Sequence, residues 1–420
     1  MKTQTIRTTL IILIAFFLGY YFGVTKISFE WRSYKPHINA ISKDPPPSVT
    51  NADFSLMWTV LQKIETSYYD KKAIDPQKLV NGAISGMVGS LEDPYTVFLP
   101  PTQNSDFKQG MAGQFEGIGA ELGMKGKQII VVAPLDGSPA QKAGIKSEDA
   151  IIKVDDKFTN GWTLSQAVEK IRGPKETKVV LSILHKDENK PVDVQIVRDT
   201  ITVKSVDWWV KKVSEIKNIQ LDKIQGNKDS KVAYIRLSQF GDNTNQEWLS
   251  LINKLQLQVS GNKNVKGLIF DLRNNPGGYL TDATFIASEF IKDGTVVIQD
   301  KNGIDKNAFA VSRKGLLTEI PIIVLINKGS ASASEIVAGA LRDHNRAKLL
   351  GDTSFGKGTI QQAEELGGGA GIHVTIAKWL TPNGTWVNGK GLEPDIKVDA
   401  DKKDQAHDVQ LEKAVEELVK

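Results

Sequence analysis

A run of apolar residues, Pro321-Ile-Ile-Val-Leu-Ile326, passes directly into a stretch of small residues, Asn327-Lys-Gly-Ser-Ala-Ser-Ala-Ser-Glu-Ile-Val-Ala-Gly-Ala340. The apolar run predicts a buried strand, and the stretch after it predicts a turn into a helix. An exposed serine at such a turn can act as a nucleophile when a base lies nearby. The residues alone do not choose among Ser330, Ser332 and Ser334.

A candidate base follows in the segment Gly351-Asp-Thr-Ser-Phe-Gly-Lys-Gly-Thr-Ile-Gln361, which offers Lys357 rather than a histidine. Lysine can accept a proton only when it is neutral, and its ordinary pKa is about 10.4. The site must therefore lower this pKa, which burial away from acidic groups does. The neighbours of Lys357 in the sequence are glycine or apolar, with no adjacent carboxylate. The two segments together suggest a serine–lysine hydrolase.

Composition excludes several other classes of function. A chain of 420 residues suggests two or three domains. The net charge of +4 is small and no basic stripe carries interleaved aromatic residues, which argues against nucleic-acid binding. The absence of cysteine rules out disulfides, thiolate zinc sites and a cysteine nucleophile. No cluster of histidines and carboxylates suggests a metal, and we expect no cofactor.

The amino-terminal residues suggest a membrane anchor. Lys2 and Arg7 precede an uncharged apolar run over 8–24, at the short end of the roughly 17–25 residues that span a bilayer. Bulky residues over 20–22 occupy the zone where a signal-peptide cleavage site needs small ones. We interpret 1–25 as an uncleaved transmembrane helix. A cleaved signal peptide and a buried core helix are the alternatives.

The rest of the chain divides into parts of different pattern. Residues 26–50 are polar and end in prolines, which predicts a linker. Residues 51–102 have helical apolar spacing, with Asp75-Pro76 as a helix start. Residues 401–420 predict a solvated, charged carboxy-terminal helix.

Between these parts lie two larger units. Residues 103–200 contain short strands and two short helices, whereas 201–400 alternate strands with helices, which predicts an α/β layered domain. The whole chain is therefore expected to be a multidomain α/β protein. Predicted strands are 128–132, 150–154, 178–184, 192–197, 232–237, 267–272 and 321–326, and predicted helices are 139–143, 164–171, 245–258, 279–292 and 333–343.

Three segments of 103–200 resemble a PDZ domain: Phe115–Leu122, Ser138–Ile145 and Asp149–Asp155. The resemblance implies a β-sandwich or barrel-like domain that binds a peptide's carboxylate, with the following strand edge pairing with the peptide. The first segment matches the carboxylate-binding loop of that family. It assigns peptide binding to Gly117, Ile118, Gly119 and Ala120. Ordinary turn glycines are the alternative interpretation.

Six motifs in order resemble the C-terminal processing, or tail-specific, serine proteases of peptidase family S41. This resemblance covers about residues 53–400 and implies a catalytic core of the crotonase and ClpP type. The motifs are Gly82–Phe98, Asp271–Gly278, the segments around Ser332 and Lys357, Thr375–Gly384 and Gly391–Val398.

The family pattern assigns roles to particular residues. Ser332 matches the nucleophile and Lys357 the base, while Gln361 matches a glutamine that holds the lysine in line. The backbone amides of Gly278 and Ala333 match the oxyanion-binding donors. The residues themselves add that Asn274-Asn-Pro-Gly-Gly278 follows a predicted strand and precedes a predicted helix, where amides are free to bind an anion.

The resemblance also implies partners and a location. Substrates would be proteins recognised by their C-termini through a PDZ domain that gates access to the active site. The predicted anchor would make the enzyme a single-pass protein of the cell membrane, and the family implies that its catalytic part lies outside the cytoplasm. The helices of 51–102 would mediate homo-oligomer formation.

Three other functions fit the sequence less well. Gly351–Lys357 matches the start of a phosphate-binding loop, but Gly358 stands where the Mg²⁺-binding hydroxyl belongs. A Ser-His-Asp enzyme would need His344 or His373, neither of which lies in a recognised motif. A non-catalytic PDZ scaffold would be marked by loss of Ser332 or Lys357, and both are present.

Overall fold

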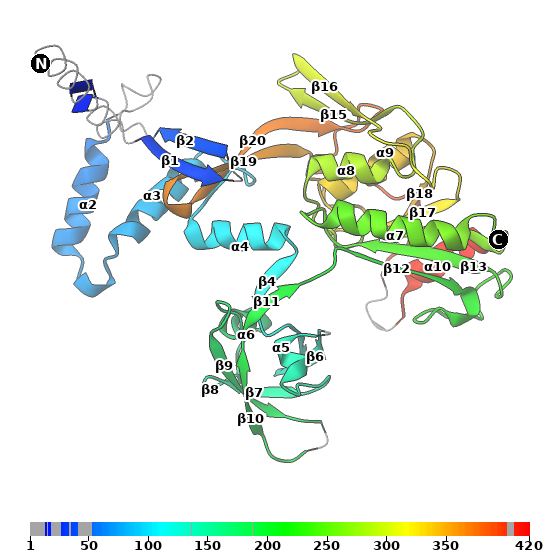
Figure 1. Ribbon diagram of the computed structural model, residues 1–420, viewed down its shortest axis with the longest axis horizontal. Coiled ribbons are helices and arrows are strands. Elements are labelled where there is room, and N and C mark those ends of the chain that lie inside the picture. Colours follow the sequence, from blue (N-terminus) through cyan, green and yellow to red (C-terminus); the bar gives the residue numbers. More distant parts are fainter. Residues whose placement is uncertain are drawn as a thin grey trace, which may run out of the picture. The chain divides into compact units, whose positions relative to one another are not determined.

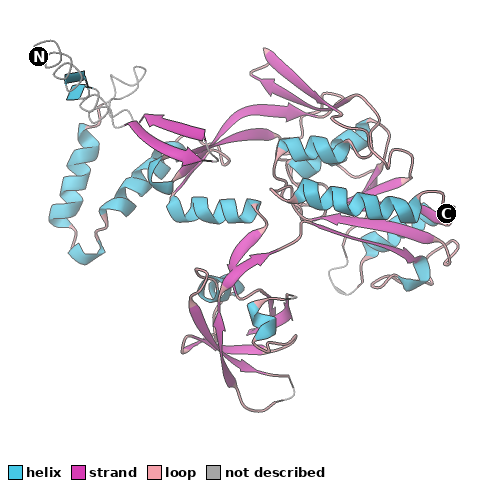
Figure 2. Ribbon diagram, viewed as in Figure 1, coloured by secondary structure: helices cyan, strands magenta, loops and turns pink. Residues whose placement is uncertain are grey.

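The computed structural model forms two compact units, one of residues 1–100 with 365–372 and one of 101–364 with 373–420 (Figures 1 and 2). The predicted membrane anchor, 1–25, lies outside the described residues except for four helical positions. Within the part of the chain that is described, no helix is both long and apolar enough to cross a membrane. The described residues are 13–14, 16–17, 27–32, 35–40, 53–135, 137–186, 188–400 and 407–420.

The first unit confirms the predicted helices between 53 and 91. Asp75 caps α3 because its carboxylate accepts hydrogen bonds from Gln77 N and Lys78 N, while Pro76 takes the first helical position. A small apolar cluster holds α3 against residues 370–372. The elements are β1 (Ile27–Arg32), β2 (Lys35–Ala40), α2 (Ser55–Ser67), η2 (Lys71–Ala73), α3 (Pro76–Gly89), β3 (Val97–Leu99) and η4 (Gly367–Gly369).

The prediction of a linker over 26–50 was wrong for part of that range. Strands β1 and β2 form an antiparallel hairpin in which Phe29 is the partner of Ile38. The sequence Ile27-Ser-Phe-Glu-Trp-Arg32 alternates apolar and polar residues, the period of a strand. The overall polarity of the segment concealed this short pattern.

The unit predicted to be a PDZ domain is a β-rich fold with two small helices. Its main sheet has the order β10-β9-β7-β6-β5, and β4 pairs separately with β11. The predicted strands 150–154, 178–184 and 192–197 and the predicted helix 164–171 match the observed bounds. The elements are β4 (Gln114–Gly117), β5 (Ala120–Lys125), β6 (Gln128–Pro134), α5 (Pro139–Lys142), β7 (Ala150–Val154), β8 (Lys157–Phe158), α6 (Leu164–Ile171), β9 (Lys178–Leu184), β10 (Val192–Val197) and β11 (Asp199–Thr202).

The catalytic-type core is a six-stranded sheet in the order β12-β13-β14-β17-β18-β21, parallel from β13 to β21. Helix α9 matches its predicted bounds, whereas α8 ends earlier than predicted. After Ala287 the bonds from Glu289 N and Phe290 N reach back only three residues, which tightens and ends the helix. The elements are β12 (Val206–Lys212), η3 (Val213–Glu215), β13 (Lys231–Leu237), α7 (Thr244–Val259), β14 (Val265–Asp271), α8 (Leu280–Ala287), β17 (Ile322–Ile326), α9 (Ala333–Asp343), β18 (Lys348–Gly351), β21 (Ile396–Lys397) and α10 (Val409–Val419).

Both faces of this sheet are buried, as the continuous apolar strand β17 requires. Ile322, Val324 and Ile326 face the core shared with α7, α8 and α9. Ile323 and Leu325 face the opposite core, which α10 covers. The sheet therefore holds the carboxyl end of β17 rigidly, and the serine-rich turn begins there.

A second sheet in the order β16-β15-β20-β19 carries the segment after Lys357. Its strands are antiparallel where β15 meets β16 and β20. The remaining elements are α4 (Pro101–Met111), β15 (Thr295–Lys301), β16 (Asp305–Ala310), β19 (Thr359–Glu365) and β20 (Gly371–Leu380).

The carboxy-terminal helix was predicted correctly as a helix but wrongly as solvated. In α10, Leu411, Ala414 and Val415 are buried against the sheet. The charged residues of the helix lie on its other side, which is why composition alone suggested exposure. Arg273 ties the start of this helix to β14, because its guanidinium donates to Asp271 and to both carboxylate oxygens of Asp408, at 2.9 Å each for Asp408.

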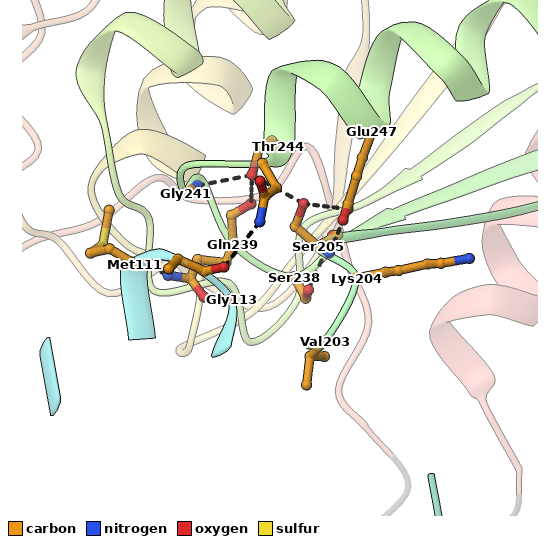
Figure 3. A pocket seen from close by; sticks show the side chains of 12 residues that line it. Met111, Gly113, Val203, Lys204, Ser205, Ser238, Gln239, Gly241, Thr244 and Glu247 are labelled. Carbon is orange, nitrogen blue, oxygen red and sulfur yellow. Dashed lines mark hydrogen bonds between the residues drawn. The ribbon is translucent and has the colours of Figure 1, made fainter. Parts of the chain in front are cut away.

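Two chain segments join the β-rich unit to the sheet, and both are hydrogen-bonded to residues 238–247, a loop and the first turn of α7 (Figure 3). In the first segment, Met111 O accepts from Asp242 N at 2.9 Å. In the second, Glu247 Oε2 accepts from Ser205 N at 2.7 Å and from Ser205 Oγ at 2.8 Å. The two segments also bind each other, through Val203 N and Gly113 O at 2.8 Å. We call the residues that make these contacts the joint: Met111, Gly113, Val203, Ser205, Asp242 and Glu247.

Removal of the charge at Asp408 should lower stability in a pH-dependent way. Burial alone would raise the pKa of Asp408, but the hydrogen bonds and charge of Arg273 outweigh it and hold the pKa below its usual value. The lowered pKa contributes stability that is present above about pH 4, the unfolded value, and is lost as pH falls through the folded value. We expect Asp408→Asn to lower the free energy of unfolding by about 1–3 kcal/mol at pH 7.

Urea unfolding at pH 7 and at pH 3 measures this effect. The difference between wild type and Asp408→Asn should shrink at the lower pH. Asp305→Asn, at an exposed carboxylate of β16, is the control and should have little effect at either pH. An equal deficit at both pH values would contradict the assignment of the ion pair.

Candidate active site

The three serines of the opening segment have different environments. Ser330 Oγ donates to Leu272 O at 2.9 Å, and Ser334 Oγ donates to Asn275 O at 2.7 Å, with both residues fully buried. Ser332 is partly exposed and lies at the turn between β17 and α9. Its backbone has φ 54° and ψ −116°, a conformation that costs energy for any residue except glycine. Ser332 is thus the most accessible of the three serines, while the hydroxyls of Ser330 and Ser334 hold the turn in place.

The loop Asn274–Gly278 lies against this serine turn. Asn275 O accepts from Ala331 N at 3.0 Å as well as from Ser334 Oγ. Asn274 and Asn327 form a reciprocal pair, because Asn327 Oδ1 accepts from Asn274 N and Asn274 Oδ1 accepts from Asn327 Nδ2, both at 2.9 Å. The loop and the turn are therefore one hydrogen-bonded structure.

A helix follows this loop as predicted, one residue later than expected. Helix α8 begins at Leu280, and before it Gly278 forms a parallel bridge with Phe240. The bridge uses Phe240 N to Gly277 O and Tyr279 N to Phe240 O, so the Gly278 amide takes no part in it. Gly278 has a φ of +143°, which favours glycine, and its amide lies two residues before the start of α8.

Gly277 makes the closest approach to the serine turn. A Cβ atom at this position would lie 2.7 Å from Ala331 O, 2.8 Å from Ser332 Cβ and 2.9 Å from Ala333 N. Its φ of +97° is also one that side chains disfavour. Glycine is thus required here on both grounds, and its small size leaves space beside the Ala333 amide.

A buried carboxylate connects the serine to the lysine segment. Glu335, in the first turn of α9, is fully buried. Its Oε2 accepts from Ser332 N at 2.8 Å and from Lys357 N at 2.9 Å. Its Oε1 accepts from Gly356 N at 2.7 Å and Ser354 Oγ at 2.5 Å. Because one oxygen atom binds both amides, Ser332 and Lys357 are brought together although they lie in different elements.

Gln361 lies on β19, two residues into the strand. Its side-chain nitrogen donates to Thr359 Oγ1 at 2.9 Å and to Thr375 Oγ1 at 3.1 Å. Neither bond goes to Lys357. The glutamine is thus near the lysine in sequence but is held by threonines of β19 and β20.

The two histidines differ in their distance from the serine. His344 follows α9, so the whole helix separates it from Ser332, a length of roughly 16 Å at 1.5 Å per residue. Burial, and then the charge of Lys357, lower the pKa of His373, which places this histidine near the lysine. The ring of His373 packs edge-on against Phe107, with 4.4 Å between centroids.

The segment around Lys357 does not form a phosphate-binding loop. Such a loop connects a strand to a helix, whose amino terminus binds the phosphates. Here strand β18 ends at Gly351, and the next regular element is strand β19.

The predicted peptide-binding residues run from the last residue of β4, Gly117, to the first residue of β5, Ala120. Gly119 has a φ of +71°, and a Cβ there would lie 2.5 Å from Ser138 Cβ. Ile118 O accepts from Ala140 N, and Gly119 O accepts from Leu135 N. The carbonyls are thus occupied. Strand β5 ends the order of the described sheet, so its outer edge is open to an additional strand.

Three residues that lie at the candidate sites were not predicted from the sequence. Glu335 and Gly277 lie at the serine turn, and Arg172 lies beside the predicted peptide-binding loop. Glu335 lies three residues after Ser332, the spacing of a capping box, which could have identified it. Gly277 stood within a noted motif. Arg172, the C-cap of α6, packs beside Gly117 and places its guanidinium 4.9 Å from the centroid of the Phe115 ring. Nothing in its local sequence indicated this position.

Comparison with known proteins shows which families the parts of the chain match. The model of peptidase family S41 matches residues 231–398, the PDZ domain model matches 108–184, and the model of the activating protease CtpB N-terminal domain matches 19–101. The chain is 36% identical to a probable CtpA-like serine protease of Staphylococcus aureus strain N315 over 94% of this chain and 72% of that protein. It is 38% identical to the carboxy-terminal processing protease CtpA of Bacillus subtilis strain 168, over 84% of this chain and 70% of that protein.

A solved structure shares the fold. A putative S41 protease from Bacteroides fragilis superposes with a TM-score of 0.53 at 13% identity, covering 89% of this chain and 92% of that one. The S41 match and the two relatives show that the chain is a serine protease with a PDZ domain. The chain belongs to the C-terminal processing proteases of peptidase family S41.

A side chain at position 277 should abolish activity. The added methyl group of Gly277→Ala would meet Ser332 and the Ala333 amide, where a reacting carbonyl would need to lie. Loss of one oxyanion donor typically costs about 2.7–4 kcal/mol of barrier, so we expect at least about a hundredfold loss of kcat.

Gly303→Ala is the matched control for this substitution. Gly303 also has a positive φ, +76°, but a Cβ there meets nothing within 4 Å. Gly303→Ala should lower stability through the strained backbone conformation but leave peptide hydrolysis unchanged. Near-normal kcat for Gly277→Ala would show that the side of the loop at Gly277 does not face the bound substrate.

Replacement of Glu335 by glutamine should weaken the connection between the Ser332 turn and the Lys357 segment. An amide at this position keeps the size of the side chain but can accept through only one of its two terminal atoms. We expect Glu335→Gln to fold with an unfolding free energy about 1–3 kcal/mol lower and to hydrolyse peptide slowly. Thermal unfolding and kcat, measured on one preparation, check this, and unchanged values of both would contradict the described contacts.

Proposed function

We propose that the protein is a membrane-anchored serine endopeptidase that uses a Ser332–Lys357 dyad on proteins recognised by their C-termini. The observation that carries this proposal is the single carboxylate oxygen of Glu335 that binds the amides of both residues. That contact supports a nucleophile and a base whose backbones are held at a fixed separation.

The chemistry would proceed in two halves. Ser332 Oγ forms a bond to the substrate carbonyl carbon while the neutral Lys357 amine takes the hydroxyl proton. The negative charge on the carbonyl oxygen is stabilised by amides at Gly278 and Ala333. Collapse breaks the peptide bond, and Lys357 returns its proton to the leaving amine. Water, deprotonated by the same amine, then releases the acyl group and regenerates Ser332.

Gln361 contributes to this mechanism indirectly. Its bonds to Thr359 and Thr375 join β19 to β20 close to the lysine. We assign it to maintaining the strand geometry behind Lys357 rather than to proton transfer.

The PDZ domain would bind the substrate's C-terminus and gate the active site. The open edge of β5 supports strand addition by an extended peptide, and the Gly117–Ala120 loop would receive the carboxylate. The joint supports a route for gating, because its loop pairs with the loop of Gly277 through Phe240. A change in the direction of the linkers would then reach the oxyanion donors.

The amino-terminal run would anchor the enzyme with its catalytic part outside the cytoplasm. The uncharged run over 8–24 supports an anchor, and the absence of cysteine is compatible with this location. Several apolar side chains of α2 are exposed, among them Leu56 and Trp58, which supports self-association of this region.

Substitution of either member of the dyad tests the proposal. We expect Ser332→Ala and Lys357→Met to abolish cleavage of a protein with a free apolar C-terminus while thermal unfolding stays near that of wild type. The same protein with an amidated C-terminus should be cleaved poorly by the wild type. Cleavage by Ser332→Ala would favour a PDZ scaffold without this active site, and equal turnover of amidated protein would reject C-terminal recognition.

A further inference from the structure

Two tryptophans bind the backbone carbonyls at the lysine. Trp379 Nε1 donates to Lys357 O at 2.9 Å, and Trp386 Nε1 donates to Gly358 O at 2.9 Å. The Gly358 carbonyl also accepts from Trp379 N at 3.1 Å. In the peptide group between Lys357 and Gly358, Asn388 Oδ1 accepts from Gly358 N at 3.1 Å. With Glu335 on the Lys357 amide, every backbone polar group of Lys357 and Gly358 is occupied.

These two tryptophans differ in burial. Trp379 is fully buried and forms part of the main core, whereas Trp386 is 46% exposed. A tryptophan left half in solvent contributes less to the core than a buried one. Its position is nevertheless fixed, because its ring nitrogen is bound and the Lys378 ammonium lies 5.5 Å from its ring centroid. Lys378 is itself paired with Asp300 at 3.4 Å.

The contact between Trp386 and the lysine segment is close. A Cβ on Gly358 would lie 2.6 Å from Trp386 Nε1 and 2.7 Å from Asn388 Cβ. Glycine at 358 thus allows the asparagine to reach the Lys357–Gly358 peptide group and the indole to reach the carbonyl of the next peptide group. The same glycine replaces the hydroxyl residue that a phosphate-binding loop would have.

From this geometry we infer that Trp386 is a positioning residue for the base Lys357, acting through the Gly358 carbonyl, with Asn388 as its counterpart on the Gly358 amide. The inference rests on the proposed role of Lys357 and adds residues that set its orientation. A lysine side chain has four rotatable bonds, so its amine can meet a serine hydroxyl reproducibly only if the backbone below it is fixed. Loss of one such bond should therefore reduce turnover more than substrate binding.

The experiment compares Trp386→Phe, which removes only the ring N–H and part of the ring, with Trp208→Phe. Trp208, on β12, is partly buried and its ring nitrogen has no hydrogen bond among the described residues. With a quenched peptide bearing a free apolar C-terminus, we expect Trp386→Phe to lower kcat about tenfold with KM within about twofold of wild type. Trp208→Phe should keep wild-type kcat and KM.

Asn388→Ala provides a second, independent test and should lower kcat in the same way. If Trp386→Phe does not fold, Asn388→Ala decides. Wild-type kcat in the folded variants, or a rise in KM with kcat unchanged, would overturn the positioning role provided that Lys357→Met is inactive. If Lys357→Met retains turnover, the proposed dyad itself is wrong, which is a separate result.

Discussion

The arrangement of this active site depends on one buried carboxylate. Glu335 lies in the first turn of α9 and binds the backbone of Ser332 behind it and of Gly356 and Lys357 across from it. A buried carboxylate is costly unless its oxygens are hydrogen-bonded, and here each oxygen accepts two bonds, three of the four from main-chain amides. Those amides cannot move without leaving a buried charge unsatisfied. The strained backbone of Ser332 can persist because its surroundings fix it in this way.

The other loops of the candidate site are hydrogen-bonded to the turn and the segment that Glu335 joins. The loop of Asn274–Gly278 is bonded to the serine turn through Asn275 and Asn327, and it is paired through Phe240 with the loop that holds the joint. The indole groups of Trp379 and Trp386 complete the fixation of the lysine segment. The two linkers, the Ser332 turn, the Lys357 segment and the Asn274–Gly278 loop thus share one hydrogen-bonded network. The proposed gating would act through this network.

Local patterns in the sequence predicted most of the α-helices but only seven of the strands, and the strands of the second sheet were missed. A nearly continuous apolar run located the strand 178–184, and Thr163 with Gln166 forms the capping box that begins α6 at the predicted residue. The hairpin within 27–40 and the burial of α10 were missed because overall polarity concealed an apolar face. The choice of Ser332 over Ser330 and Ser334 required the resemblance to the family. Only the structure gives a physical reason, since it shows the other two hydroxyls bound to carbonyls nearly sixty residues away. Contacts of that sequence separation leave no local period.

The most direct measurement of the central claim is the site and rate of reaction with a fluorophosphonate, which modifies an activated serine. Peptide mapping of the wild-type protein should place the adduct on Ser332, and the rate should rise with pH as the lysine amine becomes neutral. In Lys357→Met, labelling should be slower by orders of magnitude. An adduct on another serine, or equal labelling of Lys357→Met and wild type, would contradict the account.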